Sequence, residues 1–479
     1  MLKEISHVFA KTKILATLGP ASATAESIQQ LIDAGLDGVR LNFSHGKYDF
    51  YESLYNSIDV ACKQKQAPLA VLIDLQGPKI RVGDLVEPEI ELVEGTKIEI
   101  TSKNILGTKN RISTSYKLLT NDAKVGDTIL IDDGLLKLIV TSKSDNSVFC
   151  EVESGGILKP RKGMNLPGMR LSTPSVTEKD IADLTFALKH RLDYIALSFV
   201  RKAIDIIELK NWLKKHGSNV PVIAKIEKEE AVNNFDDILK AADGIMVARG
   251  DLGVEMSACR VPIIQKQIIK RCNSVGKLVI TATQMLESMI NNPVPTRAEA
   301  SDVANAVWDG TDVVMLSAET SVGKNPVRAV QIMNNIVRFA EENLEKVSEI
   351  PYEIPSTIEE NLFDSYCNAV SELSKRVKAS AIVVFTHKGR TAVRLSKYRP
   401  NARIVAISDC FNTMNSLCLK YGVTSIFSED IKDEQNAVEK AKQLVIQSGH
   451  VSPGDIVLIT SGAPFSDKNR LNWLKFAVI

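Results

Sequence analysis

The chain has no excess of charge of one sign. Its 479 residues include 59 Lys and Arg against 58 Asp and Glu, which leaves a formal net charge of +1. A protein that binds nucleic acid or an anionic membrane through its overall field needs a clear positive surplus. This balance argues against both classes of partner, and we expect neither nucleic acid nor a membrane to be bound.

Long apolar runs and paired cysteines are also missing. No segment approaches the roughly 18 consecutive apolar residues that cross a bilayer. The first residues, MLKEISHVFAKTK, lack the apolar stretch of a secretory signal. The seven cysteines contain no CxxC pair, and the six histidines add no zinc-like spacing. Since 44% of the residues are hydrophobic, we expect a soluble, cytoplasmic, globular protein with reduced thiols.

Eight short β-branched runs alternate with helix-length amphipathic stretches. Near-continuous apolar strands that alternate with helices are typical of a parallel sheet covered on both faces. Eight such units predict an α/β protein built on a closed (β/α)8 TIM barrel. Thr177 precedes an acidic first turn at Asp180, and Thr296 forms a capping box with Glu299. The predicted strands are residues 13–18, 38–41, 69–73, 194–199, 222–226, 244–247, 278–281 and 312–316.

Two stretches interrupt this alternation. Residues 79–170 show short alternating strands and turns such as Asp132-Asp133-Gly134, which predict a small inserted β-barrel lid domain. The segment SEIPYEIPSTIEE, residues 348–360, is typical of a linker, and strand and helix patterns resume after it. We therefore expect a barrel domain of residues 1–78 and 171–342, an insert of residues 79–170 and a C-terminal α/β domain of residues 343–479.

Polar and charged residues follow nearly every predicted barrel strand. In TIM barrels, functional groups gather at the C-terminal ends of the strands, so these side chains converge on one mouth. For any single position, a charged residue where the chain meets water is an equally good explanation, but that explanation fits the whole set poorly. The residues are Arg40, Asn42, Asp74, Ser198, Lys225, Glu227, Asp251, Thr283, Ser317 and Glu319.

The residue types at this mouth suit phosphoryl transfer. Glu227 and Asp251 follow adjacent strands and are a natural pair for a hard divalent cation. Two solvated acids or two helix caps would show the same sequence pattern. Lys225 faces the same side as Glu227, and a lysine inside a barrel is costly unless it meets an anion. The chain has no GxxxxGK[ST] loop, so a nucleotide would bind elsewhere, under the insert.

The ordered motifs of the chain resemble those of the pyruvate kinase family over nearly the whole length. In that family the barrel is catalytic, the insert is a lid and the C-terminal domain carries effector sites. The matching blocks are RLNFSHG at 40–46, DLQGPKIR at 74–81, KGMNLPG at 162–168, AKIE at 224–227, MVARGDLGVE at 246–255, TATQMLESM at 281–289, PTRAEASDVANAV at 295–307 and LSAET at 316–320.

The resemblance implies transfer of the phosphoryl group of phosphoenolpyruvate to ADP, which gives pyruvate and ATP in the final step of glycolysis. It also implies a Mg2+ (or Mn2+) cofactor and a homotetramer. In this family Lys225 and Arg40 would contact the phosphoryl group, and Glu227 with Asp251 would hold the metal. The other implied roles are carboxylate binding by Gly250, Asp251 and Thr283, nucleotide binding by Asn42, His45, Arg81 and Lys162, and a proton relay of Thr283 with Ser317 and Glu319.

The monovalent-cation region departs from the family's usual pattern. Many members bind K+ through an Asn, a Ser, an Asp-Thr pair and a glutamate; here Asn42, Ser44 and Asp74 remain. Leu75 offers no side-chain oxygen, and Lys79 stands where the glutamate would be. We expect the Lys79 ammonium to replace K+, so the chain resembles the K+-independent branch. The alternative is that Lys79 faces solvent and backbone oxygens bind K+.

A loop in the C-terminal domain resembles the family's effector-phosphate loop. Its amides and hydroxyls precede a predicted helix, whose positive end favours a phosphate. A phosphosugar or a nucleotide would be the effector, although Lys388 replaces the usual serine and a plain polar connection would look the same. The loop consists of Thr386, His387, Lys388, Gly389, Arg390 and Thr391.

Three other functions compete with a kinase. Lys225 inside a barrel could be the Schiff-base nucleophile of a lyase, although Glu227 and Asp251 beside it favour a metal. A metabolite sensor without catalysis would keep the fold, but the intact set of Lys225, Glu227, Asp251 and Thr283 disfavours it. The charge balance disfavours a nucleic-acid-binding protein.

Overall fold

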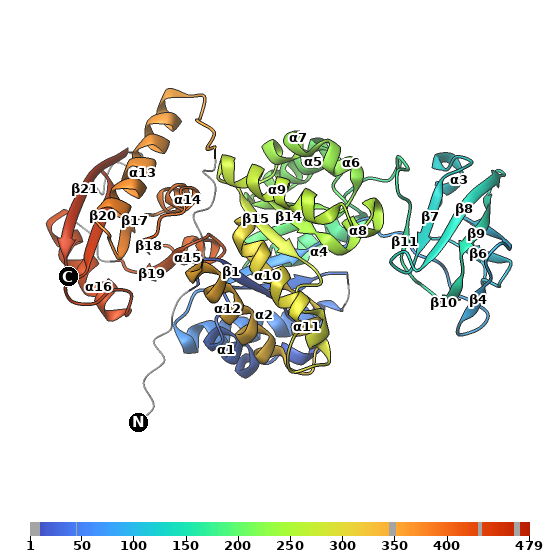
Figure 1. The fold of residues 1–479 in the computed structure, drawn as a ribbon, viewed down its shortest axis with the longest axis horizontal. Coiled ribbons are helices and arrows are strands. Elements are labelled where there is room, and N and C mark those ends of the chain that lie inside the picture. The colour runs from blue at the N-terminus through green and yellow to red at the C-terminus, as the bar shows by residue number, and fades with distance from the viewer. Residues whose placement is uncertain (1–9, 45, 344–350, 430–433, 464–469) are drawn as a thin grey trace.

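The computed structural model describes residues 10–44, 46–343, 351–429, 434–463 and 470–479. Its centre is a closed barrel of parallel strands in the order β1-β16-β15-β14-β13-β12-β3-β2 (Figure 1). The eight predicted strands are confirmed, with ends that shift by two residues at most. They are β1 (Lys13–Thr17), β2 (Gly38–Asn42), β3 (Ala70–Asp74), β12 (Tyr194–Leu197), β13 (Val222–Ile226), β14 (Gly244–Ala248), β15 (Leu278–Ala282) and β16 (Val313–Leu316).

Helices cover the outside of the barrel. Thr177 caps one of them by accepting from the N–H of Asp180, and Thr296 accepts from that of Glu299, so both predicted helix starts are confirmed. No described helix combines the length and the apolar content needed to cross a bilayer. The helices are α1 (Ala25–Asp33), α2 (Tyr48–Lys65), α4 (Glu178–Ala187), α5 (Ala203–Lys215), α6 (Glu229–Asn233), α7 (Phe235–Ala241), α8 (Arg249–Met256), α9 (Val261–Val275), α10 (Arg297–Asp309), α11 (Ala318–Ser321) and α12 (Pro326–Glu342), with 3-10 turns at Pro20–Ser22 and Glu287–Ile290.

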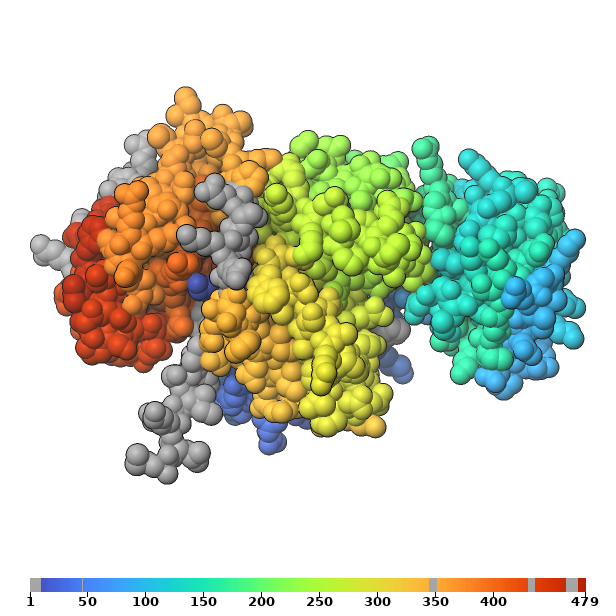
Figure 2. Space-filling model, in the orientation of Figure 1, coloured from blue at the N-terminus to red at the C-terminus, as the bar shows by residue number. Residues whose placement is uncertain are grey.

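The insert between β3 and α4 is a separate β domain that projects from the barrel (Figure 2). A curled six-stranded sheet, ordered β11-β7-β8-β9-β5-β6, encloses its own apolar core. The predicted turn Asp132-Asp133-Gly134 joins two of these strands, with positive φ at all three residues. The elements are β4 (Ile90–Leu92), β5 (Lys97–Thr101), β6 (Arg111–Ser113), α3 (Leu119–Asp122), β7 (Thr128–Ile131), β8 (Leu136–Lys143), β9 (Ser147–Ser154), β10 (Gly156–Leu158) and β11 (Met164–Asn165).

The C-terminal domain is a five-stranded sheet, ordered β19-β18-β17-β20-β21, with helices beside it. Its first helix begins at Ile358 behind the N-cap Thr357, so the predicted linker is wrong at its end, because Glu359 and Glu360 form the acidic first turn of that helix. Residues 348–350 of the linker lie outside the described residues, and the predicted domain boundaries stay a prediction. The elements are α13 (Ile358–Arg376), β17 (Ala381–Phe385), α14 (Arg390–Lys397), β18 (Arg403–Ser408), α15 (Phe411–Leu417), β19 (Val423–Phe427), α16 (Glu434–Gln447), β20 (Ile456–Ala463) and β21 (Arg470–Val478).

The C-terminal domain closes the N-terminal end of the barrel. Cys418 and Leu419, just after α15, belong to the same apolar cluster as the side chains inside the barrel, such as Leu15. The Tyr194 hydroxyl donates to the carbonyl of Ser416. The barrel interior is therefore covered at this end, and a site open to substrates lies at the opposite end, where the predicted polar residues are.

Four aspartates form a repeated contact at the covered end. Each precedes an alternate strand and accepts from the first or second N–H of the neighbouring strand, at 2.8 to 2.9 Å. An N–H at a strand start has no ladder partner of its own, so each carboxylate satisfies a backbone donor that the barrel would otherwise bury. The pairs are Asp37 with Ile14, Asp193 with Val71, Asp243 with Val222 and Asp312 with Val279.

Asp193 makes the stability of the barrel depend on pH. Burial raises the pKa of Asp193 to about 6, against about 3.9 in an unfolded chain. Its contribution is therefore fully present below pH 3.9 and is lost as the pH rises through 6. Relative to Asp193→Asn, the unchanged protein should lose up to about 3 kcal/mol between pH 4 and 7. Thermal unfolding followed by circular dichroism at each pH measures this difference.

The matched control is Asp243→Asn, which removes the same type of backbone contact. The Asp243 side chain is 40% exposed and is paired with Lys210, so this variant shows what loss of the backbone contact alone does to stability. If the difference in stability between the unchanged protein and Asp193→Asn does not change with pH, the proposed pH dependence through Asp193 is contradicted.

Candidate active site

Polar side chains of four neighbouring strands meet at the open mouth of the barrel. The parallel register pairs Asn42 at the end of β2 with Asp74 at the end of β3. Arg40 lies two residues before Asn42 and therefore on the same face of β2. Ser198 follows β12, and Lys225 lies on β13. The structure thus brings together the residues that were predicted from their positions at strand ends.

Asp74 is the shared partner of these side chains and is 1% exposed. Its Oδ2 accepts from Arg40 Nε at 2.8 Å, and its Oδ1 accepts from Lys225 Nζ at 3.1 Å. Ser198 Oγ donates to the same Oδ1 at 3.3 Å. Burial alone would raise the pKa of Asp74, but Lys225 and Arg40 outweigh it and lower that pKa below its ordinary value. Asp74 is therefore a carboxylate that holds two cations.

Lys225 lies between two carboxylates. Its Nζ is 2.9 Å from Oε1 of Glu227 and donates to Ser198 Oγ at 2.8 Å. Burial alone would lower the pKa of Lys225, but Asp74 and Glu227 outweigh burial and raise it. The side chain is therefore a fully charged ammonium, which suits an anionic ligand and does not suit a nucleophilic amine.

Arg40 is held from both sides. Its Nη1 donates to Thr17 Oγ1 of β1 at 2.9 Å, while its other nitrogens meet Asp74. The side chain is 11% exposed, so it reaches the mouth without being free in water. Two cations, Arg40 and Lys225, balance two carboxylates, Asp74 and Glu227, which is the condition under which buried charges are tolerated.

Glu227 and Asp251 are close enough to influence each other's charge. Burial raises the pKa of Glu227, the Asp251 carboxylate raises it further, and Lys225 opposes both. Oε2 of Glu227 accepts from the N–H of Phe199 at 2.8 Å. No hydrogen bond or ion pair of the Asp251 carboxylate is found among the described residues, and that side chain lines the pocket between barrel and insert.

Glu227 and Asp251 fit a divalent cation whose remaining ligands come from a substrate. No cluster of three or more acidic, histidine or cysteine ligands is present in the described part of the chain. Mg2+ usually binds proteins through one or two carboxylates and takes its remaining oxygens from phosphates and water. Glu227 and the uncommitted Asp251 provide that number of ligands.

Thr283 lies beside the start of α8. Its hydroxyl accepts from the N–H of Gly250 at 2.8 Å and donates to the carbonyl of Ala282 at 2.6 Å. The helix begins at Arg249, so the N–H groups of its first turn have no partners within the helix and attract anions. Thr283 and Gly250 therefore lie together, as predicted for a carboxylate-binding site.

Ser317 and Glu319 are joined to each other. Oε2 of Glu319 accepts from the N–H of Ser317 at 2.7 Å, and Oε1 accepts from the N–H of Leu286 at 3.1 Å. Glu319 is fully buried. Among the described residues no hydrogen bond links either of them to Thr283, so the relay from Thr283 through Ser317 and Glu319 stays a prediction.

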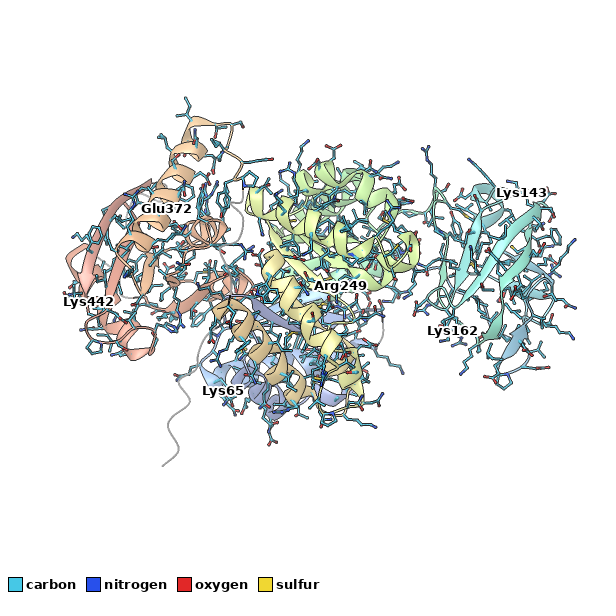
Figure 3. All side chains as sticks on the ribbon, viewed as in Figure 1. Lys65, Lys143, Lys162, Arg249, Glu372 and Lys442 are labelled. Atoms are coloured by element: carbon cyan, nitrogen blue, oxygen red, sulfur yellow. The ribbon has the colours of Figure 1, made fainter. Side chains whose placement is uncertain are left out.

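The predicted nucleotide residues lie on two domains. Asn42 is at the barrel mouth, where its Oδ1 accepts from the N–H of Ser44 at 3.2 Å. Arg81 and Lys162 are in the insert, on two segments joined by an antiparallel β-bridge between the backbones of Arg81 and Gly163. Figure 3 labels Lys162 in the insert, where it forms an ion pair of 2.8 Å with Asp132. His45 lies outside the described residues.

The two residues that depart from the family's monovalent-cation pattern, Leu75 and Lys79, differ in their exposure. Leu75 is fully buried, and its carbonyl accepts from Ser198 Oγ at 2.7 Å. Lys79 is exposed, forms no ion pair within the described ranges, and lines the pocket between barrel and insert together with Asp251. Lys79 therefore borders the same pocket as Asp251, one of the two predicted metal ligands, and its replacement of K+ stays a prediction.

The predicted effector loop connects β17 to α14. Gly389 is the N-cap of the helix with φ of 75°, and its N–H donates to Thr386 Oγ1 at 2.9 Å. His387 contacts Asp409 at 2.7 Å, and Arg390 is paired with Glu360 at 2.8 Å. The strand-to-helix connection is confirmed, while phosphate binding by Thr386, His387, Lys388, Gly389, Arg390 and Thr391 stays a prediction.

Two contacts of the site were missed from the sequence. Asp74 was assigned only to the cation region, whereas it pairs with both Arg40 and Lys225. Arg249 was included only within the block MVARGDLGVE at 246–255, whereas it binds the backbone next to Thr283. The available signal was that Asp74 ends the strand after that of Arg40, since the register pairs Asp74 with Asn42, two residues after Arg40.

The chain is similar to known proteins over nearly its whole length. The family model of the pyruvate kinase barrel domain matches residues 9–330, and that of the pyruvate kinase alpha/beta domain matches residues 364–477. Pyruvate kinase of Geobacillus stearothermophilus is 43% identical over 98% of this chain and 80% of its own length. That of Bacillus licheniformis is 42% identical with the same coverage.

A solved structure shows the same likeness in three dimensions. The crystal structure of a pyruvate kinase from Cryptosporidium parvum matches with a TM-score of 0.91 at 36% identity, over 98% of this chain and 96% of that one. With both family models, the close relatives and this fold in agreement, the chain belongs to the pyruvate kinase family of phosphotransferases.

Proposed function

We propose that the chain transfers the phosphoryl group of phosphoenolpyruvate to ADP and releases pyruvate and ATP in glycolysis. The observation that carries this proposal is the charged Lys225, held between Asp74 and Glu227 beside Arg40. Phosphoryl transfer needs little covalent chemistry from a protein and depends on positioning and on neutralising charge. Arg40 and Lys225 are two fixed cations at the barrel mouth, and they supply both the positioning and the neutralisation of charge.

The roles of the protein groups follow from where their donors lie. Arg40 and Lys225 bind oxygens of the phosphoryl group, and Lys225 stabilises the charge that develops during transfer. The N–H groups of Gly250 and Asp251 with the Thr283 hydroxyl bind the carboxylate of phosphoenolpyruvate, which thereby replaces the present contacts of Gly250 with Thr283 and of Thr283 with Ala282. Transfer leaves an enolate of pyruvate, which needs a proton at carbon. Thr283, with Ser317 and Glu319, is the proposed source of that proton.

Glu227 and Asp251 would hold Mg2+ or Mn2+. When bound, the metal neutralises phosphate charge and orients substrate oxygens. The protein's part is to oppose protonation of Glu227 through Lys225 and to present Asp251 without a competing partner among the described residues. ADP would be bound by Asn42 and His45 on the barrel side and by Arg81 and Lys162 on the insert, which we propose acts as a lid.

We further propose that the reaction needs no K+. Leu75 has no side-chain oxygen for the ion, and Lys79 brings an ammonium to the cleft. A phosphosugar or a nucleotide would bind the loop of residues 386–391 as an effector. We expect a cytoplasmic homotetramer that binds neither nucleic acid nor membranes, with domains of residues 1–78 with 171–342, 79–170 and 343–479.

The lyase alternative requires a neutral Lys225, since only a free amine attacks a carbonyl. Asp74 and Glu227 raise the pKa of Lys225 and keep it protonated. The kinase is therefore the better function for this mouth.

The direct test is pyruvate release from phosphoenolpyruvate with ADP and Mg2+, in Na+ buffer and again in K+ buffer. We expect comparable rates in the two buffers and none when the metal is chelated with EDTA. Lys79→Met should lower the rate in Na+ buffer, because the cleft then has neither the Lys79 ammonium nor K+. The exposed Lys103→Met in the same insert is the matched control and should keep the rate.

Each outcome of this assay has a clear meaning. A rate that appears only with K+ would keep the kinase and remove the proposed role of Lys79. No pyruvate in either buffer would contradict the kinase itself and favour a sensor, and a pyruvate adduct trapped by borohydride would favour the lyase.

Lys225→Met should lower kcat by about 10²–10³-fold, because the developing phosphoryl charge loses its closest cation. The variant should also lose about 3–5 kcal/mol of stability at neutral pH, since two buried carboxylates lose their shared partner. Lys225 helps to lower the pKa of Asp74, so this loss should be present above about pH 4 and shrink as the pH falls below it. Steady-state kinetics and thermal unfolding at several pH values measure both effects.

The matched control is Lys13→Met, which removes a buried ion pair with Asp37 at the covered end of the barrel. It should lower stability and leave kcat within about twofold, since catalytic groups gather at the other end. Unchanged turnover in Lys225→Met would refute the proposed role of Lys225.

A further inference from the structure

Two consecutive residues after β15 have a left-handed backbone. φ is 68° at Thr283 and 54° at Gln284, and neither is glycine. This conformation is unfavourable for a residue with a side chain, so the surrounding structure must maintain it. The same backbone determines where the Thr283 hydroxyl lies relative to Gly250.

One guanidinium group binds this strained segment. Nη2 of Arg249 donates to the carbonyls of Thr283 at 2.7 Å and Gln284 at 3.3 Å, and Nε donates to that of Ala282 at 3.3 Å. Nη2 also contacts the sulfur of Met285. Arg249, labelled at the centre of Figure 3, therefore contacts four consecutive residues at the end of β15.

Arg249 is itself fixed by the helices behind it. Nη1 meets the Asp302 carboxylate of α10 at 2.7 Å and Gln265 of α9 at 3.4 Å. Gln265 in turn donates to Asp309 at 3.1 Å. The Arg249 side chain is 10% exposed, so these charge-assisted contacts are largely shielded from water. The guanidinium has a single orientation, set by α9 and α10.

We propose that Arg249 is a positioning residue, which holds Thr283 so that its hydroxyl and the first N–H groups of α8 face the carboxylate of the substrate. The inference rests on the proposed role of Thr283. Every nitrogen of the Arg249 guanidinium is already bonded to protein groups, so it acts through the segment and not on the substrate. Arg249 also precedes Gly250 in the chain, and thus connects both halves of the carboxylate site.

The planar shape of the guanidinium is essential to this role. Lys in place of Arg249 keeps a positive charge for Asp302, but a single ammonium cannot reach three carbonyls in a fork. Arg249→Lys should therefore preserve the fold and only part of the activity. A residue that served stability alone would tolerate this exchange.

The test is a double-mutant cycle of Arg249→Met with Thr283→Ala in the full-length protein. A misplacement of about 1 Å costs on the order of 10²-fold in rate, so each single variant should lower kcat/KM for phosphoenolpyruvate by about that factor. The double variant should lose far less than the product of the two single losses, because Arg249 acts largely through Thr283. KM for ADP should change little in all three variants.

Arg399→Met is the matched control. Arg399 also binds an aspartate, Asp312, and a backbone carbonyl, that of Gly310, but at the covered end of the barrel. It should lower the unfolding temperature by an amount similar to Arg249→Met and leave kcat/KM within about twofold. Arg249→Lys keeps the test usable if Arg249→Met does not fold.

The outcomes separate this inference from the proposed function. If Thr283→Ala lowers kcat/KM but Arg249→Met and Arg249→Lys do not, or if the two losses multiply, the positioning role is overturned and the function of Thr283 stands. If Thr283→Ala itself leaves kcat/KM within about twofold, the proposed role of Thr283 is wrong and the inference falls with it.

Discussion

The buried carboxylate of Asp74 is the group on which the rest of the mouth depends. Arg40 and Lys225 come from different strands, and each would be costly to bury without a partner. Asp74 pairs with both and is 1% exposed. Glu227 then completes the charge balance by forming an ion pair with Lys225. The positions of two cations and two carboxylates are therefore fixed before any substrate arrives, which is the preorganisation that electrostatic catalysis requires.

The two ends of the barrel have different roles: the covered end stabilises the fold, and the open mouth carries the candidate active site. At the covered end, four aspartates satisfy strand N–H groups and the C-terminal domain packs Leu419 against the barrel interior. The open mouth combines the charged group of Asp74, Lys225 and Glu227 with left-handed backbone at Phe199, Thr283 and Gln284. Phe199 donates its N–H to Glu227 and Thr283 accepts from Gly250, so two of these three residues contact groups that the proposed reaction uses.

The sequence predicted the barrel well because its strands are uninterrupted apolar runs with polar residues directly after them. Parallel strands place those residues at one end, so the composition of the mouth followed from position alone. Pairing within the mouth did not follow: Asp74 and Arg249 act through side-chain directions that arise only when strands close into a barrel. The start of α13 was missed because Pro and Glu near Thr357 resemble a linker, although Thr357 and Glu360 also form a helix start. His45 lies outside the described residues.

The most direct test of the account is the effect of Asp74→Asn on pyruvate formation from phosphoenolpyruvate and ADP. Asn has the same shape but no charge, so Arg40 and Lys225 lose their shared anion while the fold, followed by circular dichroism, is retained. We predict a fall in kcat/KM for phosphoenolpyruvate of about 10²-fold, in line with the loss of one preorganised charge contact. A folded variant with kcat/KM within about twofold of the unchanged protein would contradict the central role of Asp74.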